Sequence, residues 1–549
     1  MEKRALIAIV LSFAVFFGYT KVVEMIYPDY GKKQEQKVSE TAAGSQLTPD
    51  AQMPAAGASG AVPVPAAASA VPADETVSFA YPGYEFIYSA NQASFTEARL
   101  TAYPDNQGGA FRFLKSTSGR TGVGMMDAVL VDGDNAEGLR YQTTREGRVV
   151  RSAAKNDKVR IEKSWNISPQ GYGHGFSVSV TNVSDAPVRF RYRLLAGSKP
   201  VVHNSIDEQY IEGNWLTAAK LQHIRKPGID KPKTLNEPVI AASMKNRHFS
   251  SIFKPTETAG TFSAHVEAYD KHDFGSYLVR SEAVIQPGET LRDGFVWFIG
   301  PNRVEDLQPL GLDRIVNFGK LDFIAKIVLG GLHMIAGLVK NYGLAIVLLT
   351  IFTNVLFMPL TKTSFMSMRR MQLVQPEAMK LREKYKSNPT KLNEETMALY
   401  KKNKVNPMGG CLPMLLQMPI FMGLYVSLSK APELLGSGFL WAKDLASPDR
   451  IPLPFTLPLI GDGIHLLPLI MVGAMVAQQK FTAASMPAAD PAMAQQQKIM
   501  MTVMPIMFGF IFYQMPSGLV VYWLTNTLVM TGYQAFLKKT NPIPAASTA

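Results

Sequence analysis

The sequence predicts a multi-span α-helical membrane protein that carries a large β-sandwich domain outside the cytoplasm. Long apolar runs dominate residues 322–537. Residues 76–305 instead alternate between apolar and polar side chains, which is typical of half-buried β-strands. Basic residues cluster beside the apolar runs, as the positive-inside rule requires of cytoplasmic loops.

The composition leaves room for several domains and does not indicate nucleic-acid binding. The chain has 549 residues, of which 47% are hydrophobic, and a formal net charge of +12. A charge of this size also occurs in proteins that bind nucleic acids. Here many of the basic residues flank apolar runs, so membrane topology accounts for them and we expect no nucleic-acid specificity.

The N-terminal part is predicted to be an anchor followed by a linker. Residues 1–27 begin with a basic stretch and continue as an apolar run, and no small-residue cleavage motif follows. We therefore predict an uncleaved transmembrane anchor. Residues 28–75 are charged at first and then rich in Ala, Pro, Gly and Ser, a composition that favours a flexible linker.

Residues 76–310 are predicted to form the β-sandwich domain. Alternation is clear in residues 158–167, 176–184 and 188–195, and turn-forming residues separate these runs. Many short strands with little helical periodicity favour a sandwich of two or more sheets.

Residues 311–341 are predicted to contain an amphipathic helix that lies in the membrane interface. Its apolar residues fall near one face: Ile324, Ile327, Val328, Leu332, Ile335 and Leu338. The alternative is a further span, which Lys326, His333 and the Gly330-Gly331 pair disfavour.

Five further spans are predicted, and with the anchor they make six transmembrane helices. They lie at about 342–361, 409–429, 464–481, 499–514 and 517–537. A cytoplasmic N-terminus then places the β domain outside, and places the loop at 362–408 and the tail at 538–549 in the cytoplasm. Basic residues outnumber acidic ones in that loop, in agreement with this topology.

The loop at 362–408 is predicted to be a basic helical hairpin. Apolar residues recur every three or four positions from Met371 to Tyr385, and Pro389 suits the first turn of a second helix. We expect the hairpin to dock a partner through its basic residues: Arg369, Arg370, Lys380, Arg382 and Lys384. The alternative is a solvated loop whose charges serve topology alone.

Uncharged polar residues lie in the middle of several predicted spans. They include Thr350, Asn354, Gln417, Tyr522 and Asn526. Burying an unpaired amide in hydrocarbon costs roughly 2–7 kcal/mol, so we expect these side chains to face a shared polar cavity. Acidic and basic residues do not occur near mid-span positions, which disfavours a proton relay or an ion-coupled carrier.

Four stretches carry a resemblance to a known family. They are MPLTKTSFMSMRRMQLVQPE (358–377), ALYKKNKVNPMGGCLPMLLQMPIFMGLY (398–425), QQQKIMMTVMPI (495–506) and MPSGLVVYWLTN (515–526). Through them the chain resembles the YidC/Oxa1/Alb3 membrane protein insertases, specifically the Gram-negative YidC type. The resemblance is strong over residues 320–537 and looser elsewhere.

The resemblance implies a fold and an activity. Five core helices would form a groove open to the cytoplasm and the lipid, and the exported domain would be a periplasmic β-supersandwich. The protein would reside in the bacterial inner membrane. It would insert nascent membrane proteins into the lipid bilayer and help them fold, alone or with the Sec translocon. The short, uncharged tail after Lys539 implies at most weak ribosome binding. No cofactor, metal or enzymatic activity is expected.

The resemblance also implies which residues line the groove. They are Thr350, Asn354, Gln417, Met418, Phe421, Tyr522, Trp523 and Asn526. Asn354 stands where family members commonly have an arginine, so the groove is expected to be polar but uncharged. Two other functions remain open at this point: a small-solute transporter or channel, and a structural envelope protein whose activity resides in the β domain.

Overall fold

A computed structural model describes most of the chain. It covers residues 69–541 except for gaps at 72–74, 106–108, 116–122, 131–138, 199, 203–204, 226–231, 236, 257–261, 269–273, 404–411, 458–460 and 484–490. The predicted N-terminal anchor, most of the predicted linker and residues 542–549 lie outside the described residues.

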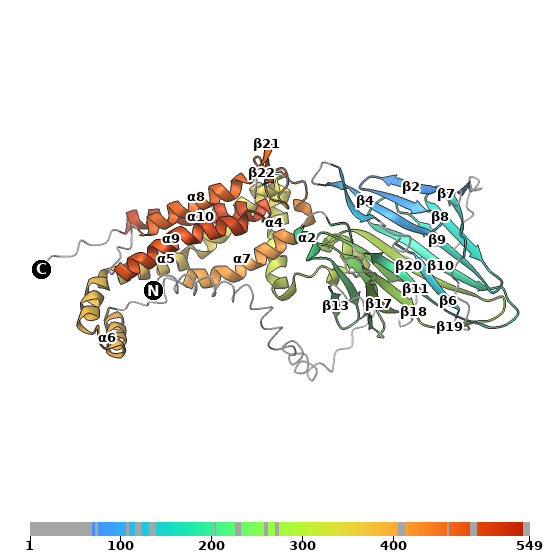
Figure 1. Cartoon of the computed structure of the whole chain (residues 1–549), viewed down its shortest axis with the longest axis horizontal. Coiled ribbons are helices and arrows are strands. Elements are labelled where there is room, and N and C mark those ends of the chain that lie inside the picture. Colours follow the sequence, from blue (N-terminus) through green and yellow to red (C-terminus); the bar gives the residue numbers. More distant parts are fainter. Residues whose placement is uncertain are drawn as a thin grey trace. The chain divides into compact units, whose positions relative to one another are not determined.

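Antiparallel sheets form the first part of the described chain (Figure 1). The largest sheet has ten strands among the described residues. In spatial order they are β1 (Ser69–Val71), β7 (Gln142–Glu146), β8 (Val149–Lys155), β9 (Val159–Asn166), β10 (Gly173–Asn182), β20 (Thr290–Pro301), β16 (Phe249–Pro255), β15 (Ala241–Lys245), β12 (Glu212–Leu216) and β13 (Leu221–Ile224). Strand β1 lies inside the predicted linker and pairs with β7. The predicted C-terminal boundary of the linker was therefore wrong, because Ser69–Val71 already belongs to the sheet.

Two smaller sheets complete the β domain. One contains β14 (Lys233–Leu235), β17 (Phe262–Ala268), β18 (Phe274–Arg280), β11 (Val188–Ser198) and β19 (Ala283–Ile285), with β6 (Met126–Leu130) also paired to β11. The other contains β2 (Thr76–Tyr81), β3 (Tyr84–Ser89), β4 (Ser94–Pro104) and β5 (Ala110–Lys115). Side chains of the three sheets share one hydrophobic core, and the predicted β-rich domain is confirmed.

The core of the β domain is built by strand alternation and by aromatic rings. Burial alternates along β9 and β10, so that one face of each strand is apolar and buried. Trp165 and Trp297 are fully buried and pack edge to face, with ring centroids 5.2 Å apart. Phe95 joins them and stacks on Trp297 at 4.9 Å. Aromatic pairs of this kind add to the free energy gained from burial.

Helices form the second part of the described chain. Short helices α2 (Ser205–Glu208) and α3 (Val304–Leu307) belong to the β region, and a β21–β22 hairpin (Ile451–Leu457 and Gly461–Ile464) was not predicted. The longer helices are α4 (Asp322–Val339), α5 (Tyr342–Lys384), α6 (Pro389–Lys402), α7 (Leu412–Lys430), α8 (Leu466–Ala483), α9 (Pro491–Phe512) and α10 (Ser517–Thr540). Each predicted span from 342 onward thus coincides with a helix.

Several helix ends differ from the prediction. Helix α5 does not end near 361. It runs for 43 residues, from Tyr342 to Lys384, with Pro359 and Pro376 inside it. Helix α9 begins at Pro491, within the predicted loop, and α10 extends into the predicted tail. Each of these helices extends beyond its apolar run into polar sequence.

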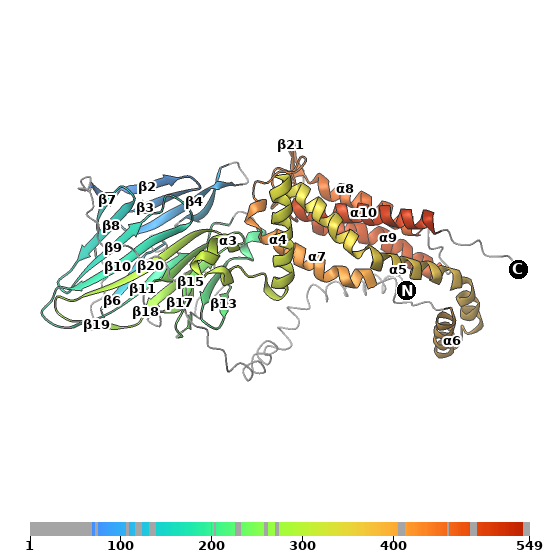
Figure 2. The same ribbon diagram turned by 180° about the vertical axis from the view of Figure 1, so that it is seen from behind.

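Helix α4 crosses the other long helices instead of running along them (Figure 2). Its buried side chains are Ala325, Val328, Leu332 and Ala336, and its most exposed apolar ones are Phe323, Ile327, Met334 and Leu338. Of the residues predicted to share one apolar face, Val328 and Leu332 are buried, whereas Ile327 and Leu338 are exposed. Within the described residues, 322–339 and 342–371 are the two helical stretches long and apolar enough to span a membrane.

Candidate functional site

An amide pair joins the apolar first half of α5 to the apolar part of α10. The Nδ2 atom of Asn354 donates to Oδ1 of Asn526 at 2.9 Å and to the carbonyl oxygen of Thr350 at 2.8 Å. Asn354 is 9% exposed and Asn526 is half-buried. Each amide therefore meets a polar partner in place of the water it lost on burial.

Helix α5 places Asn354 through local signals at its N-terminus. Asn341 caps the helix, because its side chain accepts a hydrogen bond from the backbone N–H of Leu344 at 2.8 Å. About two and a half turns later, Thr350 is fully buried and its hydroxyl donates to the carbonyl of Ile346 at 2.6 Å. The Thr350 side chain thus bonds within its own helix, while Asn354, one turn further on, reaches the neighbouring helix.

A second polar pair joins α7 to α10. The Nε2 atom of Gln417 donates to the hydroxyl oxygen of Tyr522 at 2.7 Å. Tyr522 is 1% exposed, and Gln417 is half-buried. The tyrosine hydroxyl supplies the amide with an acceptor in an apolar setting, as buried tyrosines commonly do.

Aromatic rings surround this second pair. Phe421 packs edge to face against Trp523 with ring centroids 4.9 Å apart, and it lies nearly parallel to Tyr522 at 6.4 Å. Trp523 also contacts Phe508 and Phe512 of α9, at 5.3 and 5.2 Å. Met418, on the same turn of α7 as Gln417, is 36% exposed.

The eight predicted groove residues therefore form two clusters that share α10. Thr350, Asn354 and Asn526 make one, and Gln417, Phe421, Tyr522 and Trp523 make the other, with Met418 at its edge. The polar members are neutral amides and hydroxyls, which can donate and accept hydrogen bonds. The sequence predicted these residues but not which of them pair.

The second half of α5 and all of α6 lie within the segment predicted to be a helical hairpin. Helix α5 ends at Lys384 and α6 begins at Pro389, where the Asn388 side chain accepts from the N–H of Lys391 at 3.1 Å. The inward face of α5 is as predicted, since Met371, Val374, Ala378, Leu381 and Tyr385 are all buried or half-buried.

Four of the five predicted docking residues are exposed, and the fifth, Arg369, is buried. Arg370, Lys380, Arg382 and Lys384 are exposed. Arg369 is only 8% exposed, and its guanidinium donates to the backbone carbonyl of Asn541, just after α10. Arg369 therefore ties α5 to the end of α10 and is not available for docking.

Sequence reasoning missed a buried polar contact between the β domain and α7. Arg247, in the β15–β16 turn, is 5% exposed and donates to the backbone carbonyls of Ser429 and Ala446. Its Nη1 also donates to Asp207 at 3.4 Å. Arginine in a turn between two strands is ordinarily exposed, so the sequence carried no signal for this role.

Comparison with known proteins identifies the family. A family model described as "60Kd inner membrane protein" matches residues 334–544, and one described as "YidC periplasmic domain" matches residues 79–329. The membrane protein insertase YidC of Syntrophus aciditrophicus is 30% identical over 564 residues, covering 98% of this chain and 100% of that protein. The chain belongs to the YidC membrane protein insertases.

Other YidC proteins are similarly related. The YidC of Geobacter sulfurreducens is 31% identical and covers 98% of both chains, and that of Syntrophobacter fumaroxidans is 34% identical over 70% of this chain and 69% of its own. Among solved structures, an active YidC insertase with its first transmembrane domain resolved has a TM-score of 0.38 and 20% identity, covering 86% of this chain and 94% of that one.

Family membership confirms the main expectations from sequence. The protein is a membrane protein insertase, its substrates are membrane proteins, and its family name describes insertion and not an enzymatic reaction. Like other YidC insertases, it is an inner membrane protein with a periplasmic β-rich domain and a membrane-inserted helical part.

Proposed function

We propose that the substrate of this YidC insertase enters the membrane through a polar groove between α5, α7 and α10, open to the cytoplasm and to lipid. The observation that carries the proposal is the pair of neutral interhelical hydrogen bonds, Asn354 to Asn526 and Gln417 to Tyr522. Amides midway along apolar helices can exchange partners with the polar flank of an incoming chain. Thr350, Met418, Phe421 and Trp523 complete the lining of the groove.

The groove lowers the main energetic barrier of insertion. A polar flank has to cross about 30 Å of hydrocarbon, and a hydrated path through part of that distance reduces the penalty for its polar groups. The apolar segment then leaves sideways into lipid, where burial contributes about 25 cal/mol per Å². Phe352 and Leu356 of α5 are 63% and 61% exposed, which suits a face that contacts lipid.

The proposed topology follows the charge distribution. Six transmembrane helices, with both termini in the cytoplasm, place residues 76–310 in the periplasm and α4 in the membrane interface. Residues 342–537 are then the insertase core. The crossing direction of α4 and its mixed exposure support an interfacial position over a sixth core span.

The hairpin formed by the second half of α5 and by α6 is proposed to receive the nascent chain. Its exposed basic residues, Arg370, Lys380, Arg382 and Lys384, project where a cytoplasmic partner would approach. Partners at this surface include the nascent membrane protein and, weakly, the ribosome. Cooperation with the Sec translocon belongs to the same proposal.

Site-specific crosslinking tests the groove. A photoreactive residue placed at Asn354, Phe421 or Trp523 is expected to crosslink a stalled nascent span. The matched control is Phe536, which is on α10 but 60% exposed and away from the polar pairs. Crosslinks at Phe536 that equal those at the three groove positions would contradict a substrate path between these helices.

Reconstitution tests insertion itself. The purified protein in liposomes is expected to insert a small single-span substrate without ATP, whereas protein-free liposomes should insert far less. Loss of this activity in the Asn354→Ala/Tyr522→Phe double variant, with the fold retained, would assign the activity to the polar pairs. Full activity of that folded variant would move the substrate path elsewhere.

A further inference from the structure

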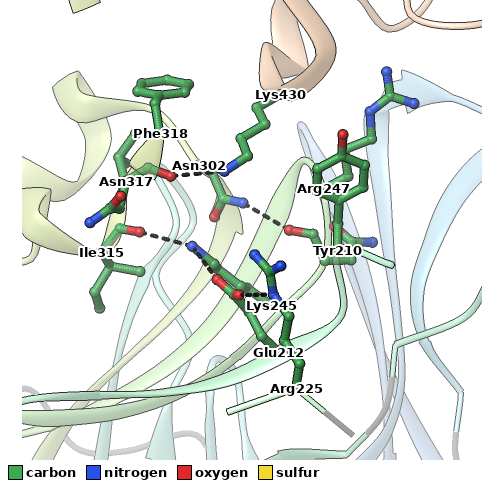
Figure 3. A pocket seen from close by; sticks show the side chains of 12 residues that line it. Tyr210, Glu212, Arg225, Lys245, Arg247, Asn302, Ile315, Asn317, Phe318 and Lys430 are labelled. Carbon is green, nitrogen blue, oxygen red and sulfur yellow. Dashed lines mark hydrogen bonds and ion pairs between the residues drawn. The ribbon is translucent and has the colours of Figure 1, made fainter. Parts of the chain in front are cut away.

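A cavity lies where the loops of the β domain meet the end of α7 (Figure 3). Its volume is about 20 Å³, which exceeds the roughly 10–15 Å³ that a single water molecule needs. The walls come from the start of β12, the β15–β16 turn, the segment before α4 and Lys430 of α7. None of the eight proposed groove residues is among those that line the cavity, although Lys430 ends the same helix that carries Gln417 and Phe421.

Cationic side chains outnumber carboxylates in the lining. Arg225, Lys245, Arg247 and Lys430 all line the cavity, and Glu212 is the acidic residue among its twelve lining residues. Glu212 is already shared, because its carboxylate oxygens lie 3.0 Å from Nζ of Lys245 and 2.9 Å from Nε of Arg225. The local charge is therefore positive.

Lys430 contributes to this positive charge from the membrane part of the chain. It directly follows the predicted span 409–429, and its side chain points toward the β domain (Figure 3). The Nζ atom donates to the backbone carbonyl of Asn317 at 2.9 Å, and the rings of Tyr210 and Phe318 flank it at 6.0 and 5.8 Å. Its hydrogen-bond acceptor is thus a neutral carbonyl and not a carboxylate.

The pKa values of two lining residues are consistent with a cavity that favours a bound anion. Burial, and then the nearby charge of Lys245, lower the pKa of Lys430 to about 8. Burial raises the pKa of Tyr210 to about 12, so this hydroxyl stays neutral and supplies no counter-charge. An anion in the cavity would offset the repulsion between the two lysines.

Donors reach the cavity from opposite sides. Lys430 enters from the α7 side and Lys245 from the floor of the sheet, with Arg225 beyond it (Figure 3). Oxyanions have several acceptor atoms and bind well where lysine and arginine converge. We propose that this cavity binds a phosphate-type oxyanion, with Lys430 and Lys245 as its cationic ligands. Because Lys430 comes from α7 and Lys245 from the β domain, the bound anion would join the two parts of the protein.

Thermal unfolding of the full chain in a neutral detergent tests the proposal. Inorganic phosphate is titrated against chloride at constant ionic strength, and tryptophan fluorescence reports the midpoint. A ligand that binds the folded state raises the midpoint, and the stabilisation grows with the logarithm of its concentration above Kd. Lys430→Met should weaken phosphate affinity roughly 10- to 100-fold, as expected for a charged hydrogen bond.

Matched variants separate the cavity from general charge effects. Lys443→Met removes the same charge from an exposed position of the α7–α8 connection and should leave the phosphate response unchanged. If Lys430→Met fails to fold, Arg225→Met replaces it, because the Arg225 side chain is 61% exposed. No rise of the midpoint with phosphate in the native protein, or an equal response in the folded cavity variant, would overturn the proposal.

Lipid vesicles distinguish the two sources of the phosphate group. In vesicles of galactolipid, which has no phosphate, inorganic phosphate should stabilise the protein. In phosphatidylglycerol vesicles, loss of that response identifies a lipid headgroup as the occupant, and an unchanged response identifies free phosphate. Both outcomes support the site, whereas a missing response in galactolipid vesicles counts against it.

Discussion

The carboxamide of Asn354 donates to that of Asn526 at 2.9 Å and links α5 to α10 across 172 positions of sequence. The same nitrogen also donates to the Thr350 carbonyl at 2.8 Å, so both of its hydrogens are used. This pair holds the two helices together with neutral groups and fixes the geometry of one side of the proposed groove.

Breaking the Asn354–Asn526 pair should reveal a measurable coupling. We expect Asn354→Ala, Asn526→Ala and the double variant to show about 1 kcal/mol of interaction, since interhelical hydrogen bonds in membrane proteins contribute roughly 0.6–1.7 kcal/mol. Unfolding in mixed micelles with increasing SDS measures it. Thr353→Ala is the control, because its hydroxyl donates within its own helix to Thr350 at 2.9 Å. A coupling energy below about 0.3 kcal/mol would mean that the pair is incidental.

Asn354→Arg should change substrate preference. An arginine near the polar pairs attracts an acidic flank, and roughly 1 kcal/mol of attraction in a partly shielded site corresponds to about a fivefold rate change. We expect insertion of a single-span substrate with an acidic tail to rise by about that factor in liposomes, with little change for a neutral tail. Asn354→Gln keeps an uncharged amide and should change neither rate. Equal effects on both substrates would show that the added charge does not act on the substrate.

Local features were predictable from sequence, and long-range pairings were not. Pro389 and the capping residue Asn388 mark the start of α6 through contacts within four residues. The continuation of α5 through Pro359 could not be read in the same way, because proline ordinarily ends a helix. Asn354 was recognisable as an amide in an apolar run, but its partner is set by how α5 packs on α10. Arg247 and Ser429 meet across 182 positions, and only the folded chain brings them together.

Removing the Arg247 side chain should loosen the contact between the β domain and α7. Arg247→Met deletes a buried cation that donates to Asp207 and to the carbonyls of Ser429 and Ala446. Breaking a buried charged contact typically costs about 3–5 kcal/mol, so we expect a clear fall in the thermal midpoint and faster proteolysis of the 431–447 segment. Arg189→Met is the control, because Arg189 pairs with Glu282 at 2.5 Å with its side chain 51% exposed. Such exposed pairs contribute about 0–1 kcal/mol, and equal losses in the two variants would argue against a special role for Arg247.

The buried imidazole of His174 should make the β domain sensitive to acid. His174 is 1% exposed, lies among the rings of Tyr84, Phe86 and Trp297, and accepts a hydrogen bond from the N–H of Ser168 at 3.2 Å. Burial lowers its pKa to about 3. The folded protein thus keeps this ring neutral at pH values where the unfolded chain, with a histidine pKa of about 6.5, takes up a proton.

The sign of the effect follows from proton binding. Between pH 6.5 and 3 the unfolded state binds more protons at this position, so stability falls as the pH falls through that window and is unaffected above it. The total contribution is about 5 kcal/mol. His174→Asn keeps an acceptor for Ser168 and removes the titrating ring, so its unfolding free energy in urea, followed by tryptophan fluorescence, should change less between pH 7 and 4. Parallel pH profiles for the native protein and the variant would show that acid acts through other groups, because the two proteins differ in this one titrating side chain.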